Sequence, residues 1–208
     1  MKIKTINFKK FHNLDYEKER EVKGLIITIA LFTASMIIGA GLFRSTSANI
    51  SEFSDIFDNY ILTRSDETVL QLFFNSLIIN LTFILISFFA GMSCFGFPIT
   101  VILPVIKGLG YGVISGYLFS QYTMSGIGYY LLTILPGGII ANSTLLFTCN
   151  EACFLSADIL MIVLEKKQSD KNKIILYTKK IILLITISVF SSFLDSLLVK
   201  AFSYLFTF

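Results

Sequence analysis

Charged residues are scarce in this chain, and the side chains that usually carry out catalysis or bind metals are scarcer still. Only 15% of its 208 residues are charged, whereas a soluble domain has about a quarter. There is no tryptophan, and His12 is the only histidine. A net charge of +3 is too small to indicate nucleic-acid binding. With 54% hydrophobic residues and a mean hydropathy of +0.75, the composition indicates a membrane protein.

The cysteines predict neither a disulfide framework nor a metal centre. Cys94, Cys149 and Cys153 lie in or beside apolar segments, and their number is odd. Cys149 and Cys153 share a helical face, but the distant His12 is a poor partner for a zinc site. We interpret all three as small apolar fillers. The chain shows no nucleophile–base pair and no phosphate loop, so we predict no enzymatic activity and no cofactor or metal.

Long apolar runs predict an all-α integral membrane protein with a bundle of about five transmembrane helices. The run from Gly24 to Phe43 has 20 uncharged residues, enough to cross the roughly 30 Å of a bilayer core. Further spans are predicted at 69–93, 99–120, 127–164 and 181–206. The run at 127–164 is too long for one straight helix, and Pro136, Gly137 and Gly138 predict a break in it.

The distribution of basic residues orients this bundle. Residues 1–23 contain seven Lys/Arg and residues 165–180 contain six lysines, whereas 44–69 contains only two basic residues. The first two segments are therefore predicted to be cytoplasmic, and the 44–69 loop extracytoplasmic. We predict a cytoplasmic segment, 1–23, followed by one transmembrane domain, 24–208, in the bacterial cytoplasmic membrane. The N-terminus then lies inside and the C-terminus outside.

Two polar segments predict additional surface structure. Residues 1–23 suggest a short amphipathic helix on the membrane surface, or alternatively a solvated positive tail. In the 44–69 loop, apolar residues recur at helical spacing between Ile50 and Ile61. This spacing predicts a second amphipathic helix, which lies in the interface or presents a docking surface.

Small residues mark two faces for close helix packing. Gly108, Gly112 and Gly116 form a stripe along one face of the third span, so another helix can approach its backbone closely. Ser87 and Gly91 form a similar face on the second span. We expect these two faces to pack against each other.

Polar residues within apolar segments are the candidate functional positions. Asn75 and Asn80 of the second span should face another helix or lie near an interface. Lys107 lies roughly 13 Å along the third span, near mid-membrane, unless 98–107 is a re-entrant piece that places it at the surface. We expect Glu151 or Asp195 to neutralise Lys107 across the bundle.

Four short motifs follow one another along the spans. They are Phe73-Phe74-Asn75, Gly91-x4-Gly96, Lys107-Gly108-x-Gly110-x-Gly112 and Leu135-Pro136-Gly137-Gly138. Their order and spacing resemble the stage II sporulation protein M family. The resemblance covers most of residues 20–206 and implies a small five-helix membrane protein with the topology described above.

The chain departs from this family pattern at two places. Family members usually have Asn-Gly where this chain has Lys107-Gly108. They have Leu-Pro-His-Gly followed by a glutamate where this chain has Leu135-Pro136-Gly137-Gly138 and then Ala141. The polar pair that the family places beside the predicted break is therefore missing.

The resemblance implies a scaffold with no catalysis of its own, since the founding member looks like an organiser of membrane-anchored peptidoglycan-degrading enzymes in sporulation. The implied partners are other membrane proteins, namely cell-wall hydrolases or an ABC ATPase, because distant relatives accompany ABC-type export systems. The lipid bilayer and a second copy in a homo-oligomer are further partners. An alternative is a membrane subunit of an ABC-type transporter, or a small carrier or channel with a midplane site near Lys107.

Overall fold

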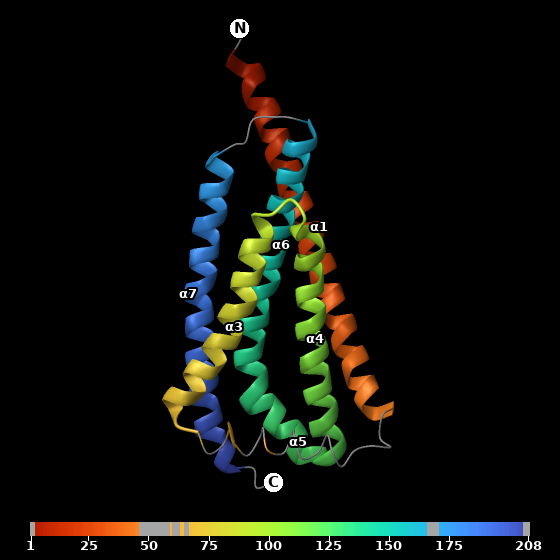
Figure 1. Ribbon diagram of the computed structural model, residues 1–208, viewed down its shortest axis with the longest axis vertical. Helices are drawn as coiled ribbons and strands as arrows, with labels where there is room; N and C mark the ends of the chain where they lie inside the picture. Colours follow the sequence, from red (N-terminus) through yellow and green to blue (C-terminus); the bar gives the residue numbers. More distant parts are fainter. Residues whose placement is uncertain (1–2, 46–58, 60–62, 65–66, 166–170, 206–208) are drawn as a thin grey trace.

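The computed structural model of this chain is a bundle of long helices (Figure 1). It describes residues 3–45, 59, 63–64, 67–165 and 171–205. The elements are α1 (Ile3–Ser45), α3 (Val69–Gly91), α4 (Gly96–Gln121), α5 (Thr123–Tyr129), the π-helical segment η2 (Tyr130–Ile134), α6 (Leu135–Glu165), α7 (Lys171–Phe202) and the 3-10 segment η3 (Ser203–Leu205).

Five helical stretches in the described residues are long and apolar enough to cross a membrane. They are Glu19–Phe43, Val69–Gly91, Gly96–Gln121, Thr123–Leu164 and Asn172–Leu205. The prediction of an all-helical protein with five spans is confirmed. The helix predicted between Ile50 and Ile61 lies outside the described residues.

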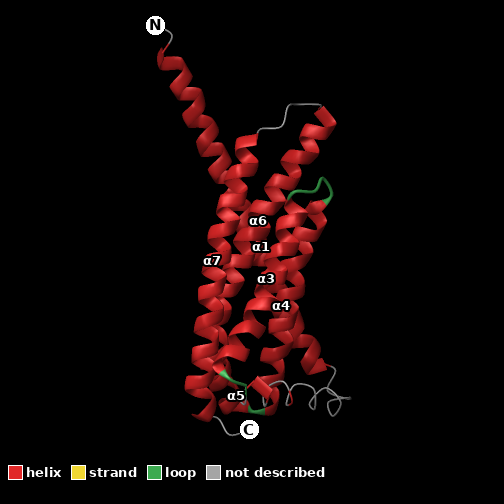
Figure 2. Cartoon of the chain, turned by 60° about the vertical axis from the view of Figure 1, so that its left-hand side comes forward, coloured by secondary structure: helices red, strands yellow, loops and turns green. Residues whose placement is uncertain are grey.

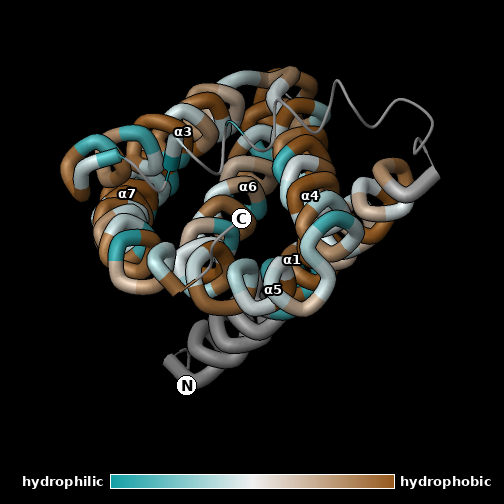
Figure 3. Tube along the Cα trace, turned by 90° about the horizontal axis from the view of Figure 1, so that it is seen from below, coloured by the Kyte–Doolittle hydropathy of each residue, from teal (hydrophilic) through white to brown (hydrophobic). Residues whose placement is uncertain are grey.

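Helix α6 is the centre of the bundle and packs against α1, α3, α4 and α7 (Figure 3). One apolar cluster lies where α3, α6 and α7 meet, and a second lies where α4 meets α5 and η2. The first consists of Ile84, Ala152, Leu155, Tyr177, Ile181 and Leu184, and the second of Tyr117, Leu118, Tyr129, Tyr130 and Ile134. These clusters hold the helices at both ends of the bundle.

The glycine stripe of α4 packs against α1. Added Cβ atoms on Gly108 and Gly112 would collide with α1, and one on Gly116 would lie 3.0 Å from the Ala40 carbonyl oxygen. Gly39 complements the stripe from α1, because its added Cβ would lie 2.5 Å from a backbone oxygen of α4. The two backbones are therefore in direct contact along this seam.

The expected pairing of the glycine stripe with the Ser87/Gly91 face is wrong. The Ser87 hydroxyl donates to Cys149 Sγ at 3.6 Å in α6. A Cβ on Gly91 would lie 2.9 Å from Ala152 Cα in α6 and 2.5 Å from the Tyr177 hydroxyl in α7. A face of small residues shows that another helix can approach closely. It does not identify that helix, because small side chains carry little that distinguishes one partner from another.

The predicted break at Pro136, Gly137 and Gly138 is not confirmed. Helix α6 begins at Leu135 and continues through these residues, while the irregular part is η2, directly before them. There the Leu135 N–H donates to the Tyr130 carbonyl five residues earlier. Pro136 lies just after this π-helical segment, and a proline, which lacks a backbone N–H, is a common cause of such an irregularity in a helix. Figure 1 shows the chain turning from α5 into α6 here.

The beginning of α1, the end of α6 and the beginning of α7 lie at one end of the bundle (Figure 1). The end of α7 lies at the other end. Residues 3–23 continue the axis of the first span as one helix, and the N-terminal part of this helix projects beyond the bundle (Figure 2). These residues therefore do not form the separate short helix on the membrane surface that the sequence suggests, and the alternative of a solvated positive tail stays a prediction.

This arrangement leads to a topology prediction. We expect alkaline phosphatase fused to the C-terminus to be active and a fluorescent protein fused there to be dark, because five crossings from a cytoplasmic N-terminus end outside. The same two reporters inserted within residues 166–170 serve as the control. There we expect the phosphatase to be inactive and the fluorescent protein to be bright. A fluorescent C-terminal fusion would contradict the orientation.

Candidate functional site

A polar cavity of about 350 Å³ lies between α3, α4, α6 and α7. Its polar lining residues are Arg64, Ser76, Asn80, Lys107, Tyr111, Ser191 and Asp195. Its small lining residues include Gly110, Gly137, Gly138 and Ala141. We call this feature the polar cavity throughout.

Lys107 is the buried cation of the polar cavity, with a relative exposure of 7%. Its Nζ donates to Asn80 Oδ1 at 2.9 Å and lies 5.3 Å from the centre of the Phe83 ring. Asn80 Nδ2 in turn donates to Ser192 Oγ in α7 at 3.3 Å. Because α4 is unbroken from Gly96 to Gln121, Lys107 lies in mid-helix, and the alternative of a re-entrant piece at 98–107 is wrong.

The expected neutralisation of Lys107 by Glu151 or Asp195 is also wrong. Glu151 accepts from Lys180 Nζ at 2.6 Å, and Asp195 pairs with Arg64. Within the part of the chain that the structure describes, no carboxylate forms an ion pair with Lys107. Sequence reasoning did not identify Arg64 as the partner of Asp195, because Arg64 lies in the polar 44–69 loop and reaches into the bundle from there.

Asp195 of α7 closes one end of the polar cavity. It accepts hydrogen bonds from Arg64 Nη2 and from the Ser76 hydroxyl of α3. Gly137 makes room for it, since a Cβ there would lie 2.8 Å from Asp195 Cβ. Gly138 likewise approaches the Tyr111 ring, with an added Cβ 3.0 Å away. The glycines predicted to break a helix thus allow α7 and α4 to approach α6.

We expect Asp195→Asn to lower the free energy of unfolding by about 2 kcal/mol, because hydrogen bonds to a charged group contribute roughly 1.5–3 kcal/mol. The amide keeps the size of the side chain but removes the charge that pairs with the mostly buried Arg64. Thermal unfolding in a mild detergent would measure the loss, with Glu67→Gln as the control at a carboxylate whose hydrogen bond, to Asn75, is exposed. Equal losses in both variants would contradict a special role for this pair.

Asn75 lies outside the polar cavity. Its Nδ2 donates to Glu67 Oε1 at 2.9 Å, next to the start of α3. There Thr68 and Gln71 form a capping box, in which the Thr68 N–H donates to Gln71 Oε1 at 2.9 Å. Asn75 therefore belongs to the helix start, whereas Asn80 holds Lys107.

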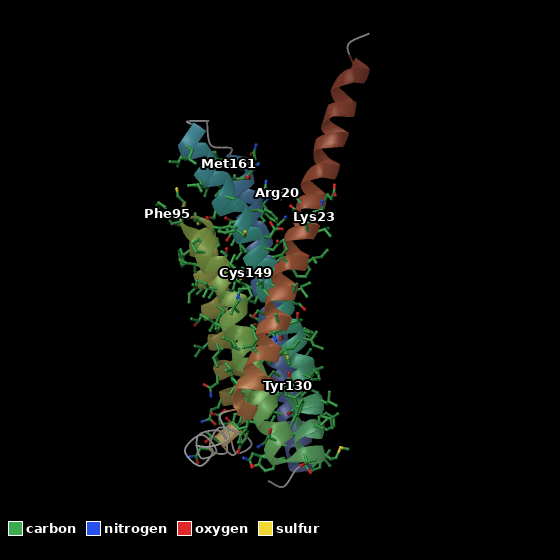
Figure 4. The ribbon with its side chains drawn as sticks, turned by 90° about the vertical axis from the view of Figure 1, so that its right-hand side faces the viewer. Arg20, Lys23, Phe95, Tyr130, Cys149 and Met161 are labelled. Carbon is green, nitrogen blue, oxygen red and sulfur yellow. The ribbon has the colours of Figure 1, made fainter. Side chains whose placement is uncertain are left out.

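Glu151 belongs to an ion-pair cluster at the end of the bundle where α1 projects. The cluster consists of Arg20, Glu21, Glu151, Asp158, Lys173 and Lys180. Asp158 lies 2.7 Å from Lys173 and 3.8 Å from Arg20. Figure 4 shows Arg20 on α1 beside α6, toward the projecting end from Cys149. The cluster therefore joins α1, α6 and α7 where α1 leaves the bundle.

The polar cavity has the chemistry of a binding site. It offers one buried cation, an ion pair and several hydroxyl and amide groups. The described residues hold no group of three or more His, Cys, Asp or Glu side chains that could bind a metal ion.

The fold and this site define a five-helix membrane protein with a polar cavity between its spans. The family model described as stage II sporulation protein M matches residues 28–200 of this chain. The chain belongs to the stage II sporulation protein M family. No curated protein and no solved structure matches it.

The positions at which this chain departs from the family pattern meet in one place. Lys107, Gly137 and Ala141 all line the polar cavity, although they come from two different helices. Asp195 packs onto Gly137 from α7.

Proposed function

We propose that this protein is a non-enzymatic scaffold of the bacterial cytoplasmic membrane that binds other membrane or cell-wall-remodelling proteins through α1. The observation that carries the proposal is the open side of α1. It is the least buried of the five spans. Of the 18 residues in its most apolar stretch, 17% are buried inside the bundle, compared with 22–39% for the other spans. A helix held on one side only leaves its other side for a partner.

The contacts of α1 support this role. It packs against α4 along the glycine seam and against α6, and its opposite side exposes large apolar side chains. Ile26, Ile37, Ile38 and Leu42 are each more than half exposed. Gly41 lies on the exposed side with open space around its Cβ position, so a partner helix can approach closely there.

The part of α1 outside the bundle supports the same proposal. Residues 3–18 add 16 helical residues, or about 24 Å, to the N-terminal end of the same helix. The ion-pair cluster fixes the base of this projection, and Asn150 Nδ2 adds a hydrogen bond to the Glu21 carbonyl at 3.2 Å. One continuous helix thus extends from the bundle to well beyond it, so a partner can meet α1 both at its open side and outside the bundle.

Crosslinking in native membranes, followed by identification of the proteins that co-purify with the tagged full chain, tests the proposal. We expect Ile37→Trp to reduce the captured partner several-fold, because the indole obstructs a helix on the open side. The matched control is Ile182→Trp on α7, where the native side chain is 59% exposed.

The identity of the captured protein separates the alternatives. A cell-wall hydrolase or another membrane-anchored enzyme supports the scaffold. Capture of an ATPase would instead favour a transporter subunit, and capture of nothing but further copies of this chain would contradict a scaffold for other proteins.

A further inference from the structure

We propose that the polar cavity binds an anionic amphiphile from the bilayer. Its compact headgroup, a carboxylate or a phosphate, lies at Lys107, and its single aliphatic chain leaves between α3 and α4. This inference does not depend on the scaffold role, because it concerns the inner side of the bundle and not the open side of α1.

The charge of the cavity carries the first step. Arg64 and Asp195 compensate each other, whereas the polar and aromatic contacts of Lys107 with described residues are to a neutral amide oxygen and the face of a ring. The described lining residues therefore sum to one uncompensated positive charge. A buried charge without a counter-ion is costly, and an oxyanion that accepts the remaining Nζ–H bonds removes that cost.

The shape of the cavity carries the second step. Its volume of about 350 Å³ is within the range of small-molecule sites. Gly110, Gly138 and Ala141 leave this space free, and a Cβ added to Gly110 would meet no atom within 4 Å. Space beside a buried cation, bounded mainly by apolar surface, suits a headgroup followed by a hydrocarbon chain.

The opening of the cavity carries the third step. Ile79 of α3 and Ile106 of α4 line the cavity and are also 54% and 52% exposed on the outer surface of the spans. Both lie well inside apolar helices, at the depth of the hydrocarbon core. The opening therefore faces lipid chains, so a bound molecule can leave its own chain in the bilayer.

Displacement of a fluorescent fatty acid tests the proposal directly. The full chain in a non-ionic maltoside detergent is loaded with cis-parinaric acid, and competitors with the same twelve-carbon chain are added. We expect dodecanoate, dodecyl phosphate or both to displace the probe at least about tenfold more effectively than dodecylamine or dodecanol. Inorganic phosphate and acetate should not displace it, because they lack the chain.

Two variants locate the binding. Lys107→Met should weaken probe binding about tenfold, in line with the loss of one charge-assisted hydrogen bond. Gly110→Leu keeps the lysine but fills the opening, and should weaken binding to a similar extent. Gly41→Leu is the matched control, since Gly41 is another exposed glycine with nothing near its Cβ position.

The following outcomes would overturn the proposal. The first is that the native chain shows no saturable binding of the probe. The second is that dodecylamine displaces the probe as well as the anions do, and the third is that inorganic phosphate alone displaces it. Unchanged binding in both Lys107→Met and Gly110→Leu would also overturn it, as would an equal loss in Gly41→Leu. None of these results bears on crosslinking at α1, so failure here and failure of the scaffold role are distinguishable.

Discussion

Gly112→Val is expected to force α1 away from α4 and to lower the free energy of unfolding by about 3 kcal/mol, the upper part of the usual range for overpacking. A Cβ at this position would overlap the Met36 carbonyl oxygen and lie 2.9 Å from its carbon and 3.0 Å from the Ala40 nitrogen. These are backbone atoms of a helix, which cannot rotate away as the end of a side chain can.

The neighbouring Gly110 provides a matched control for this prediction. Gly110→Val makes the same chemical change in the same helix, with the same loss of a glycine, but its Cβ would meet nothing within 4 Å. Unfolding in a graded series of denaturing detergent would compare the two variants. If the free energy of unfolding falls equally in both variants, backbone contact along the glycine seam does not hold α1 to the bundle.

Asn80→Leu is expected to be the most destabilising change in the polar cavity, costing about 3 kcal/mol or more. It removes the only acceptor of Lys107 among the described residues, and a buried group left without its hydrogen-bond partner costs about 1–3 kcal/mol, and more when the group is charged. Lys107→Met should change stability by no more than about 1 kcal/mol, because losing the bond to Asn80 is offset by removing a buried charge.

The double variant Asn80→Leu/Lys107→Met completes the cycle and should recover most of the stability lost by Asn80→Leu. A double-mutant cycle isolates this coupling from the separate effects of the two substitutions. Strong destabilisation by Lys107→Met, together with recovery by charge-reversed partners at Glu151 or Asp195, would instead restore the pairing expected from the sequence. Unfolding of all four proteins in one detergent would decide between them.

The spans could be predicted from the sequence because the length of an apolar run is a local property. The start of the second span at Val69 agrees with the structure, where Thr68 caps the helix. The partner of the glycine stripe could not be predicted, since Ser35, Met36 and Ala40 of α1 and the Ser87/Gly91 face of α3 are all small or adaptable surfaces.

The candidate site could be predicted only in part. Lys107 stands out because a charge is rare inside an apolar run, and that signal is local. Its partner Asn80 is 27 residues away, and the Arg64–Asp195 pair is separated by 131 residues. Counting charges found the ions but not their pairing, because the pairing depends on how the helices pack around α6.

Lys107 therefore has a different meaning from the one that its position in the sequence suggests. It does not hold helices in register through a carboxylate, and in a bundle of this kind an uncompensated cation is a cost to stability. Proteins commonly retain such costs where a site binds something. The same reasoning explains why the polar cavity, rather than the glycine seam, is where ligand chemistry is expected.

Site-specific photocrosslinking from α1 is the most direct measurement of the scaffold role. One variant of the full chain carries a photoreactive amino acid at position 37, where the native isoleucine is 73% exposed. A second variant of the same chain carries it at position 182 of α7. We predict a discrete adduct with another membrane or cell-wall-remodelling protein from position 37 and only lipid adducts from position 182. Protein adducts of the same identity and yield from both positions, or from neither, would contradict a scaffold that binds its partners through α1.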